Sequence, residues 1–363
     1  MNKTLTLLLA ILMICGLEAN AQKYANNQLN IGVGAHAFSM GNSVVASVDN
    51  TTAGYYNPAG LALIEANVQP AIMHAELFAG VAKLDYISVA APIADGTRVI
   101  GLSIIRNGVD GIPNTLFAVD ATGVFHPDRV EFFSSADYAF LLSYAQPRFL
   151  RDGLRAGINA KIIYRTAGDF TNAYGFGIDL GGQYDIDDLT LGVMLKDITT
   201  TFTAWNFNFT EEEKEVFVAT GNEIPVKSTE FAYPSINLGA AYRLYFGGKF
   251  TLLSELDLDF TTDGKRNVLV SAPVSINPHL GIELNYDDFV FLRGGLNNVQ
   301  KASNALGNER LFVQPNLGVG VKVADLTIDY ALTRFGDFND GVFSHVFSLM
   351  FDVKPKNSPS TIN

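Results

Sequence analysis

The chain has 363 residues, of which 48% are hydrophobic and only 17% charged, and its formal net charge is −12. Soluble globular proteins carry about 25% charged residues, so this composition is unusual for a soluble chain. The acidic balance argues against a nucleic-acid partner, because phosphates require lysine and arginine.

The first 21 residues have the pattern of a secretory signal peptide. Lys3 precedes a continuous apolar stretch at residues 5–17, which is too short to cross a bilayer as a helix. Ala19 and Ala21 then supply the small residues of a cleavage site. We therefore expect residues 1–21 to be removed during export through the inner membrane.

Cys15 is the only cysteine, and it lies inside this apolar stretch. A lipoprotein signal is the alternative, but Ile14 stands before Cys15 where a lipobox requires a small residue. Loss of the signal leaves the mature chain without a disulfide, a thiolate metal site or a cysteine nucleophile. No later apolar run reaches about 18 residues, so a membrane-spanning mature chain must be a closed β-barrel.

Residues 22–66 alternate poorly and are rich in glycine, with asparagine and aspartate between the glycines. This segment precedes the regular part of the chain. We expect it to enter the barrel as a short plug or to cover its periplasmic mouth.

Residues 67–353 divide into short segments in which apolar and polar residues alternate. The clearest is 154–165, where Ile158 and Ile162 share one face and Asn159 lies on the other. Alternation with a period of two predicts β-strands. An apolar face opposite a polar face suits lipid on one side and a wet lumen on the other.

The sequence predicts a transmembrane antiparallel β-barrel of about fourteen strands at residues 67–353. Every second connection is short and rich in turn formers, whereas the others are longer, as at 108–134 and 199–230. This arrangement and an even strand count are typical of outer-membrane barrels. The polar tail, 354–363, is expected to be disordered. The predicted strands begin near residues 67, 82, 97, 135, 154, 172, 188, 231, 249, 279, 289, 316, 326 and 345.

Tyrosines near the predicted strand ends suggest an interfacial girdle of aromatic side chains. They are Tyr144, Tyr164, Tyr184, Tyr242, Tyr286 and Tyr330.

Residues 40–62 carry the most specific motif, which includes Asn57, Pro58, Ala59 and Gly60. This stretch resembles the N-terminal signature of the PorV/PorQ family. That family is similar to the FadL-type outer-membrane transporters, which also have an Asn-Pro-Ala-Gly motif before a fourteen-strand barrel. The resemblance spans nearly all of the mature chain, although Val346 stands where the PorV/PorQ family often has arginine.

The resemblance implies two functions. PorV-like members serve the type IX secretion system of Bacteroidetes-type bacteria by binding secreted proteins and delivering them to the cell surface. FadL-like members pass hydrophobic small molecules, and a structural or porin-like barrel is a third alternative. We take type IX secretion as the leading hypothesis, with outer-membrane lipid, secreted cargo proteins and other secretion components as partners.

The motif at residues 57–60 also has a direct physical interpretation. Asn57 precedes a proline, which favours a turn, and Gly60 permits a close backbone approach. The turn either packs the plug into the barrel or contacts a transported ligand, and we favour packing.

Trp205, Phe207 and Phe209 cluster in the predicted loop 199–230, beside an acidic run. Such aromatics either fold inward and cap the barrel or contact a secreted partner at the outer face. The sequence leaves both alternatives open.

No catalytic motif or cofactor-binding motif was found, so we expect a protein that is not an enzyme and has no cofactor or resident metal. The five histidines lack the spacing of a zinc peptidase. Glu255, Asp257 and Asp259 alternate with apolar residues and suggest an acidic lumen stripe or a weak calcium site. We favour the simpler interpretation that they are polar-face residues paired with Arg243 or Arg293.

Overall fold

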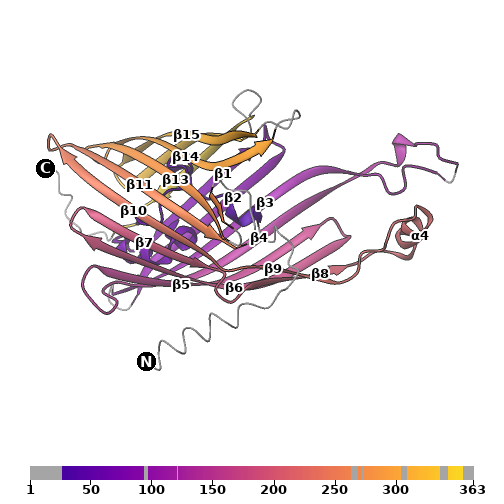
Figure 1. Ribbon diagram of the computed structural model, residues 1–363, viewed down its shortest axis with the longest axis horizontal. Helices are drawn as coiled ribbons and strands as arrows, with labels where there is room; N and C mark the ends of the chain where they lie inside the picture. Colours follow the sequence, from indigo (N-terminus) through magenta and orange to yellow (C-terminus); the bar gives the residue numbers. More distant parts are fainter. Residues whose placement is uncertain are drawn as a thin grey trace.

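The computed structural model describes residues 27–93, 97–120, 122–262, 269–271, 274–303, 309–335 and 342–354. Within them the strands form one antiparallel sheet that closes on itself, because β1 (Gln69–Leu77) pairs with both β2 (Ala82–Ile93) and β17 (Val342–Phe351). Figure 1 shows this barrel with two arms that extend from one end. The predicted signal peptide and almost all of the polar tail lie outside the described residues.

The other strands follow in chain order around the wall. They are β3 (Arg98–Asn114), β4 (Glu131–Gln146), β5 (Leu154–Ala167), β6 (Thr171–Ile186), β7 (Leu189–Lys196), β8 (Thr201–Phe207), β9 (Ser228–Ala232), β10 (Ser235–Phe246), β11 (Phe250–Thr261), β12 (Leu269–Ser271), β13 (Val274–Tyr286), β14 (Val290–Ser303), β15 (Glu309–Val323) and β16 (Leu326–Phe335).

These segments make fourteen wall strands. β7 and β8 continue one strand, because both pair with β6, and β9 continues into β10. The short β12 lies beside the start of β13. The prediction of a closed antiparallel barrel of about fourteen strands is therefore confirmed, and most strands begin within a few residues of the predicted positions.

The described helical segments are short. None of them is long and apolar enough to cross a bilayer. They are the 3-10 helices η1 (Asn27–Asn30), η2 (Pro58–Leu63) and η3 (Pro127–Arg129) and the α-helices α2 (Ala35–Ser39), α3 (Ala53–Tyr56) and α4 (Glu211–Ala219).

Inward and outward side chains alternate along the wall as the sequence predicts. On β5, Ile158 and Ile162 are exposed on the outer face, whereas Asn159 and Lys161 are buried on the inner face. Outward side chains that lie opposite one another on six neighbouring strands form a row around the barrel, and this row is wholly apolar. It consists of Ile72, Ile87, Ile104, Phe140, Ile162 and Phe176.

The next outward row toward the arms ends this apolar band. It contains Tyr138, Tyr164 and Tyr174, whose rings stack at centroid distances of 6.1 and 5.0 Å, and it continues through Arg106 and Asp85. Aromatic and charged side chains at one level are expected where a barrel wall passes from hydrocarbon to the polar interface. An aromatic girdle is thus present at this level on β4, β5 and β6, and it includes the predicted Tyr164.

Two long predicted loops are partly strand, so their predicted boundaries are wrong. The interval 108–134 shortens to 115–130, because β3 and β4 continue beyond the apolar band. The interval 199–230 contains β8, α4 and β9. These continuations form the two arms in Figure 1: an upper arm from β3 and β4, and a lower arm that carries α4.

Two connections at the arm end of the barrel are short, at 78–81 and 168–170. The wall is therefore uneven in height: it is low at β1 and β2 and tall where the arms rise (Figure 1).

Residues from η1 to η2 lie inside the barrel and form its core with inward side chains of the wall. Phe38, Met40 and Leu61 are among the largest side chains with almost no exposure. We call residues 27–66 the plug.

Candidate functional site

The plug seats on inward-facing glycines of the wall. A Cβ atom at Gly295 would lie 2.2 Å from the Gly41 nitrogen, and one at Gly157 would lie 2.4 Å from the Pro58 carbonyl carbon. Both distances are shorter than real Cβ contacts, so the plug backbone can approach these strands only because they lack side chains there. The plug backbone comes comparably close at Gly192 and Gly281, and plug side chains come comparably close at Gly181 and Gly318.

The Asn-Pro-Ala-Gly motif lies at the centre of this contact. The Asn57 amide donates to the carbonyls of Val45 (2.8 Å) and Gly182 (3.0 Å), and its oxygen accepts from the Ala59 N–H. Pro58 begins η2, where a missing N–H costs nothing. A Cβ at Gly60 would lie 2.1 Å from the Val48 oxygen. The motif therefore joins the plug to itself and to β6.

The acidic stripe of β11 binds the plug. Glu255 Oε1 accepts from the backbone N–H groups of Ala46 (2.6 Å) and Ser47 (3.3 Å), and Asp257 accepts from that of Val45 (3.0 Å). The prediction that these two carboxylates pair with Arg243 or Arg293 is wrong, because the plug supplies buried backbone donors that must be satisfied. The third carboxylate of the stripe, Asp259, lies 3.1 Å from the ring of His279.

Removing the charge of Glu255 should loosen this part of the plug. In Glu255→Gln the backbone donors of Ala46 and Ser47 lose a charged acceptor, which is worth about 1.5–3 kcal/mol. We expect faster amide exchange at these two residues while the barrel keeps its heat-modifiable mobility on a gel. Glu76→Gln, on the outer face of β1, is the control. Unchanged protection at Ala46 and Ser47 would show that Glu255 does not hold the plug.

A cavity of about 520 Å³ lies between the plug and the wall at the end of the barrel opposite the arms. Its lining is rich in charge. Arg293 pairs with Glu283 and with Asp329, at 2.5 Å in each case, and Lys322 pairs with Asp352 at 3.2 Å. These ion pairs make this side of the lumen polar.

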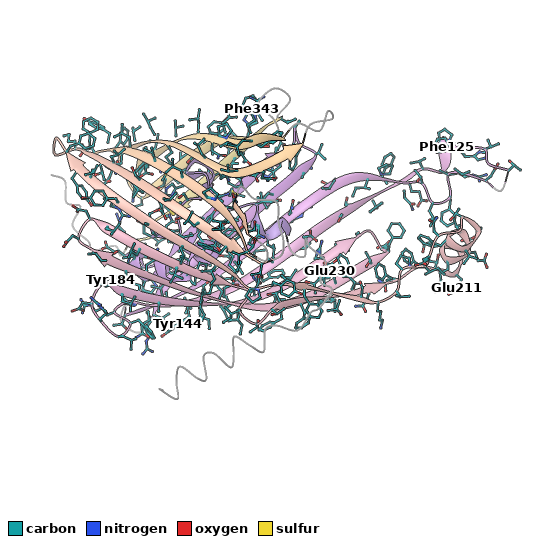
Figure 2. All side chains as sticks on the ribbon, in the orientation of Figure 1. Phe125, Tyr144, Tyr184, Glu211, Glu230 and Phe343 are labelled. Atoms are coloured by element: carbon teal, nitrogen blue, oxygen red, sulfur yellow. The ribbon has the colours of Figure 1, made fainter. Side chains whose placement is uncertain are left out.

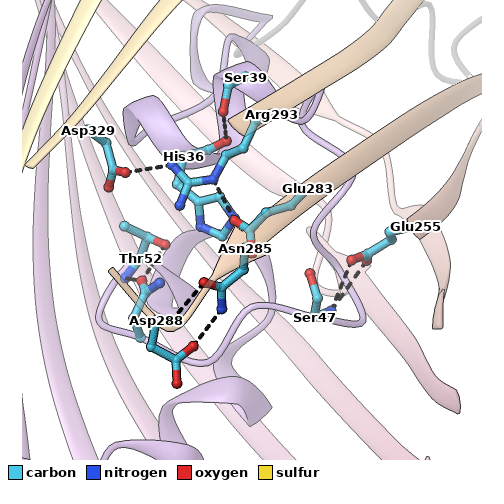
Figure 3. Close-up of polar contacts among 11 residues, drawn as sticks. His36, Ser39, Ser47, Thr52, Glu255, Glu283, Asn285, Asp288, Arg293 and Asp329 are labelled. Carbon is cyan, nitrogen blue, oxygen red and sulfur yellow. Dashed lines mark hydrogen bonds and ion pairs between the residues drawn. The ribbon is translucent and has the colours of Figure 1, made fainter. Parts of the chain in front are cut away.

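The helix α2 forms part of this cavity's lining, and Figure 3 shows its His36 beside Glu283 and Arg293. The Ala35 N–H donates to Ser348 on β17 (2.7 Å), and His36 Nε2 lies 3.4 Å from Glu283 Oε2. Burial, reinforced by the positive charge of Arg293, lowers the pKa of His36 to about 3, so its imidazole is neutral at physiological pH. The hydrogen bond from Ala35 to Ser348 thus fixes this part of the plug to β17, whereas His36 Nε2 has no hydrogen-bond partner among the described residues.

A second feature lies at the opposite end of the barrel. The rings of Trp205, Phe207, Phe209 and Phe217 follow one another at centroid distances of 6.5, 5.9 and 5.0 Å. Two further rings branch from Phe209: Phe170 lies 6.3 Å from it, and Phe133 lies 5.2 Å from Phe170. We call these six side chains the aromatic ladder.

The lower end of the aromatic ladder faces the lumen. Trp205 lies on the same face of β8 as the buried Thr201 and Thr203, and the Arg165 guanidinium covers its ring at 4.7 Å. Arg165 also binds Asp137 and Glu230. The ladder therefore runs from α4, on the lower arm, into the mouth of the barrel, where Arg165 binds Glu230, which is labelled in Figure 2.

The structure thus places the predicted site residues in two separate groups. The motif at 57–60 belongs to the plug, whereas Trp205, Phe207 and Phe209 belong to the aromatic ladder. The described residues contain no group of three or more potential ligands that could hold a metal ion. The alternation of the strands places the wall glycines on the polar face, so the sequence could have indicated them. No sequence pattern indicated that His36 lies in the plug against the wall or that Ser348 contacts the plug.

No family model and no curated protein sequence matches the chain. Among solved structures, the CymD monoaromatic hydrocarbon channel is similar at a TM-score of 0.57 and 12% identity, over 90% of this chain and 98% of that one. The chain has the fold of a FadL-like barrel. The Pseudomonas putida toluene transporter TodX aligns at a TM-score of 0.56 and 12% identity, over 88% of this chain and 98% of its own.

A Pseudomonas aeruginosa FadL homologue aligns with a TM-score of 0.52 and 13% identity, over 88% of this chain and 98% of that one. At such low identity the likeness establishes the FadL-like fold alone. None of these comparisons supports the PorV/PorQ assignment.

Proposed function

We propose that this FadL-like barrel lies in the outer membrane of a Gram-negative bacterium and passes apolar small molecules inward. The observation that carries the proposal is the aromatic ladder, which leads from the end of the lower arm to the lumen. The apolar outer band and the tyrosine row support the membrane location. Transport of this kind needs no catalytic group and no cofactor.

The spacing of the aromatic ladder suits a ligand that moves from ring to ring. Stacking between two aromatic groups contributes about 0.5–1.5 kcal/mol beyond the burial of area. Several such contacts in series attract an apolar molecule out of water, and each is weak enough to release it. Trp205, whose ring is covered by the Arg165 guanidinium, would be the last ring that the molecule meets before it enters the lumen.

Removing rings from the aromatic ladder tests this function. In the double variant Phe133→Ala/Phe207→Ala, the transported molecule loses two of the rings on which it stacks. We therefore expect the initial uptake rate of a radiolabelled monoaromatic hydrocarbon to fall about tenfold. The host should lack other barrels for such compounds.

The control replaces Phe132, the neighbour of Phe133, which is 70% exposed. Phe132→Ala should leave uptake unchanged. Equal uptake by the ladder variant, with normal amounts of folded barrel, would contradict the proposed function.

A second candidate is the binding of secreted proteins in type IX secretion, which rests on the resemblance of residues 40–62 to the PorV/PorQ family. Trp205 and Phe207 point to the lumen side of β8, so they favour the capping alternative over contact with a partner. Trp205→Ala/Phe207→Ala separates the two candidates. Loss of a co-purified secreted partner with unchanged hydrocarbon uptake would favour secretion.

A further inference from the structure

The tip of the upper arm, residues 115–120 and 122–130, is held together by hydrogen bonds to one carboxylate. Asp120 accepts hydrogen bonds from the Thr122 hydroxyl (2.6 Å), the Val124 N–H (3.0 Å) and the His126 ring (2.8 Å). These donors, with Thr122 and His126 foremost, hold the pKa of Asp120 well below its usual value. An isolated bridge between Val119 and Phe125 closes the tip.

This hydrogen-bonded tip presents apolar side chains to solvent. Val119, Val124 and Phe125 are each more than half exposed, and Phe117 is 37% exposed. A cluster of fixed apolar side chains in water is typical of an interaction surface. Because the hydrogen bonds to Asp120 already order the backbone, a partner would bind without the cost of ordering it.

The lower arm supplies a second, acidic surface. The helix α4 begins with a capping box between Thr210 and Glu213, and its first turn carries two further glutamates, Glu211 and Glu212. Figure 2 shows Glu211 on this arm and Phe125 on the tip of the other arm, at the same end of the molecule.

The two arms hold much of the protein's negative charge. Residues 110–131 and 208–227 contain nine acidic and three basic residues, so they carry a net −6 of the chain's −12. Electrostatic complementarity therefore selects a basic partner and disfavours an anionic one.

The tip also stands away from the membrane surface. On β3 the outward Arg106 lies in the tyrosine row that ends the apolar band, and the strand continues to Asn114. Eight residues of strand span about 25 Å along the strand axis, and with a barrel tilt of about 40° the tip stands roughly 19 Å beyond that row. A lipid surface is thus excluded by distance and by charge, and a second copy of the acidic arms would be repelled.

We propose that the two arms form a docking site for a protein segment that carries basic and apolar side chains. The apolar tip residues contact the apolar side chains of this segment, and the acidic residues of both arms attract its lysines and arginines. The lower arm also carries Phe209 and Phe217 of the aromatic ladder, but the apolar contacts proposed for this surface come from the tip of the upper arm, so the inference does not rest on the proposed transport function.

The test uses the full-length barrel in zwitterionic nanodiscs and a fluorescent 16-residue peptide of alternating lysine and leucine. We expect this peptide to bind in a salt-sensitive manner. Matched peptides of glutamate with leucine and of lysine with serine should bind at least about tenfold more weakly. Equal binding of all three peptides would overturn the proposal.

Three variants locate the binding. Val119→Ser/Phe125→Ser removes exposed apolar groups and should weaken binding at least about tenfold. Asp120→Asn keeps every apolar side chain but loosens the tip, and it should also weaken binding. Leu150→Ser, an 87% exposed side chain on a short turn at the opposite end, should change nothing. If the first two variants bind the peptide like the wild type, the site is not on the arms.

A photo-crosslinking residue in place of Phe125 in living cells identifies the occupant. The proposal expects a discrete protein adduct that is lost in the Asp120→Asn background. Adducts with lipid, or with a second copy of this chain, would overturn it.

Discussion

Replacing Gly295 with valine should displace the plug and open the barrel to small solutes. The new side chain would overlap the backbone of Met40 and Gly41, and backbone cannot rotate away as a flexible side chain can. Ordinary overpacking costs about 1–3 kcal/mol, and a direct overlap with backbone should cost at least as much. We expect faster entry of small sugars into vesicles that contain the variant, together with proteolytic cleavage within residues 27–66.

The neighbouring glycine provides the control for this experiment. A Cβ at Gly294 would lie 3.7 Å from a Leu317 side chain, which is an ordinary contact on the outer face. Gly294→Val should therefore keep the plug seated. Heat-modifiable mobility should show a folded barrel for both variants, and equal sugar entry would contradict the sealing role of Gly295.

Replacing Ile162 with arginine should destabilise the barrel, because it places a charge in the apolar row. Ile162 is 53% exposed in the centre of the apolar row, between Phe140 and Phe176. A lipid-facing arginine costs about 2–4 kcal/mol at the bilayer midplane and about 0–1 kcal/mol near the interface, and Ile162 lies one row inside the tyrosine row, so its cost should fall between these values. Urea unfolding in lipid vesicles measures this loss as a fall in the free energy of unfolding.

The same strand offers a matched control at another depth. Thr166 lies on the outer face of β5 beyond Tyr164, the member of the tyrosine row on that strand. Thr166→Arg should cost only about 0–1 kcal/mol, the value for positions near the interface. If both arginines cost the same, the apolar row does not lie in the membrane.

The sequence correctly predicted which strand side chains point outward wherever the outer face of a strand is apolar. On β5, alternation placed Ile158 and Ile162 outside and Asn159 inside, since a shift by one residue would reverse every side chain. Beyond the apolar band this constraint ends. On β3 a register shift between Val109 and Ile112, with Gly111 at a φ of +69°, breaks the alternation. Without alternation the sequence suggested a loop at this position, although β3 continues to Asn114.

The contacts of the plug could not be predicted from the sequence. They join residues that are far apart in the chain, such as Ser43 with Glu255 and Ala35 with Ser348. Polar residues of the wall alternate in the same way whether they face water or a buried backbone. The acidic stripe on β11 therefore looked like solvated side chains, although it binds the amides of the plug.

These long-range contacts impose an order on how the barrel is built. The plug leaves the ribosome before any wall strand, yet its partners include β17, the last strand, through a contact that spans 313 residues. Such a contact forms slowly, because the intervening chain must lose conformational entropy before its two ends can meet. The segment made first can thus be fully seated only when β1 and β17 meet, so seating of the plug and closure of the barrel should occur together as the final step of assembly.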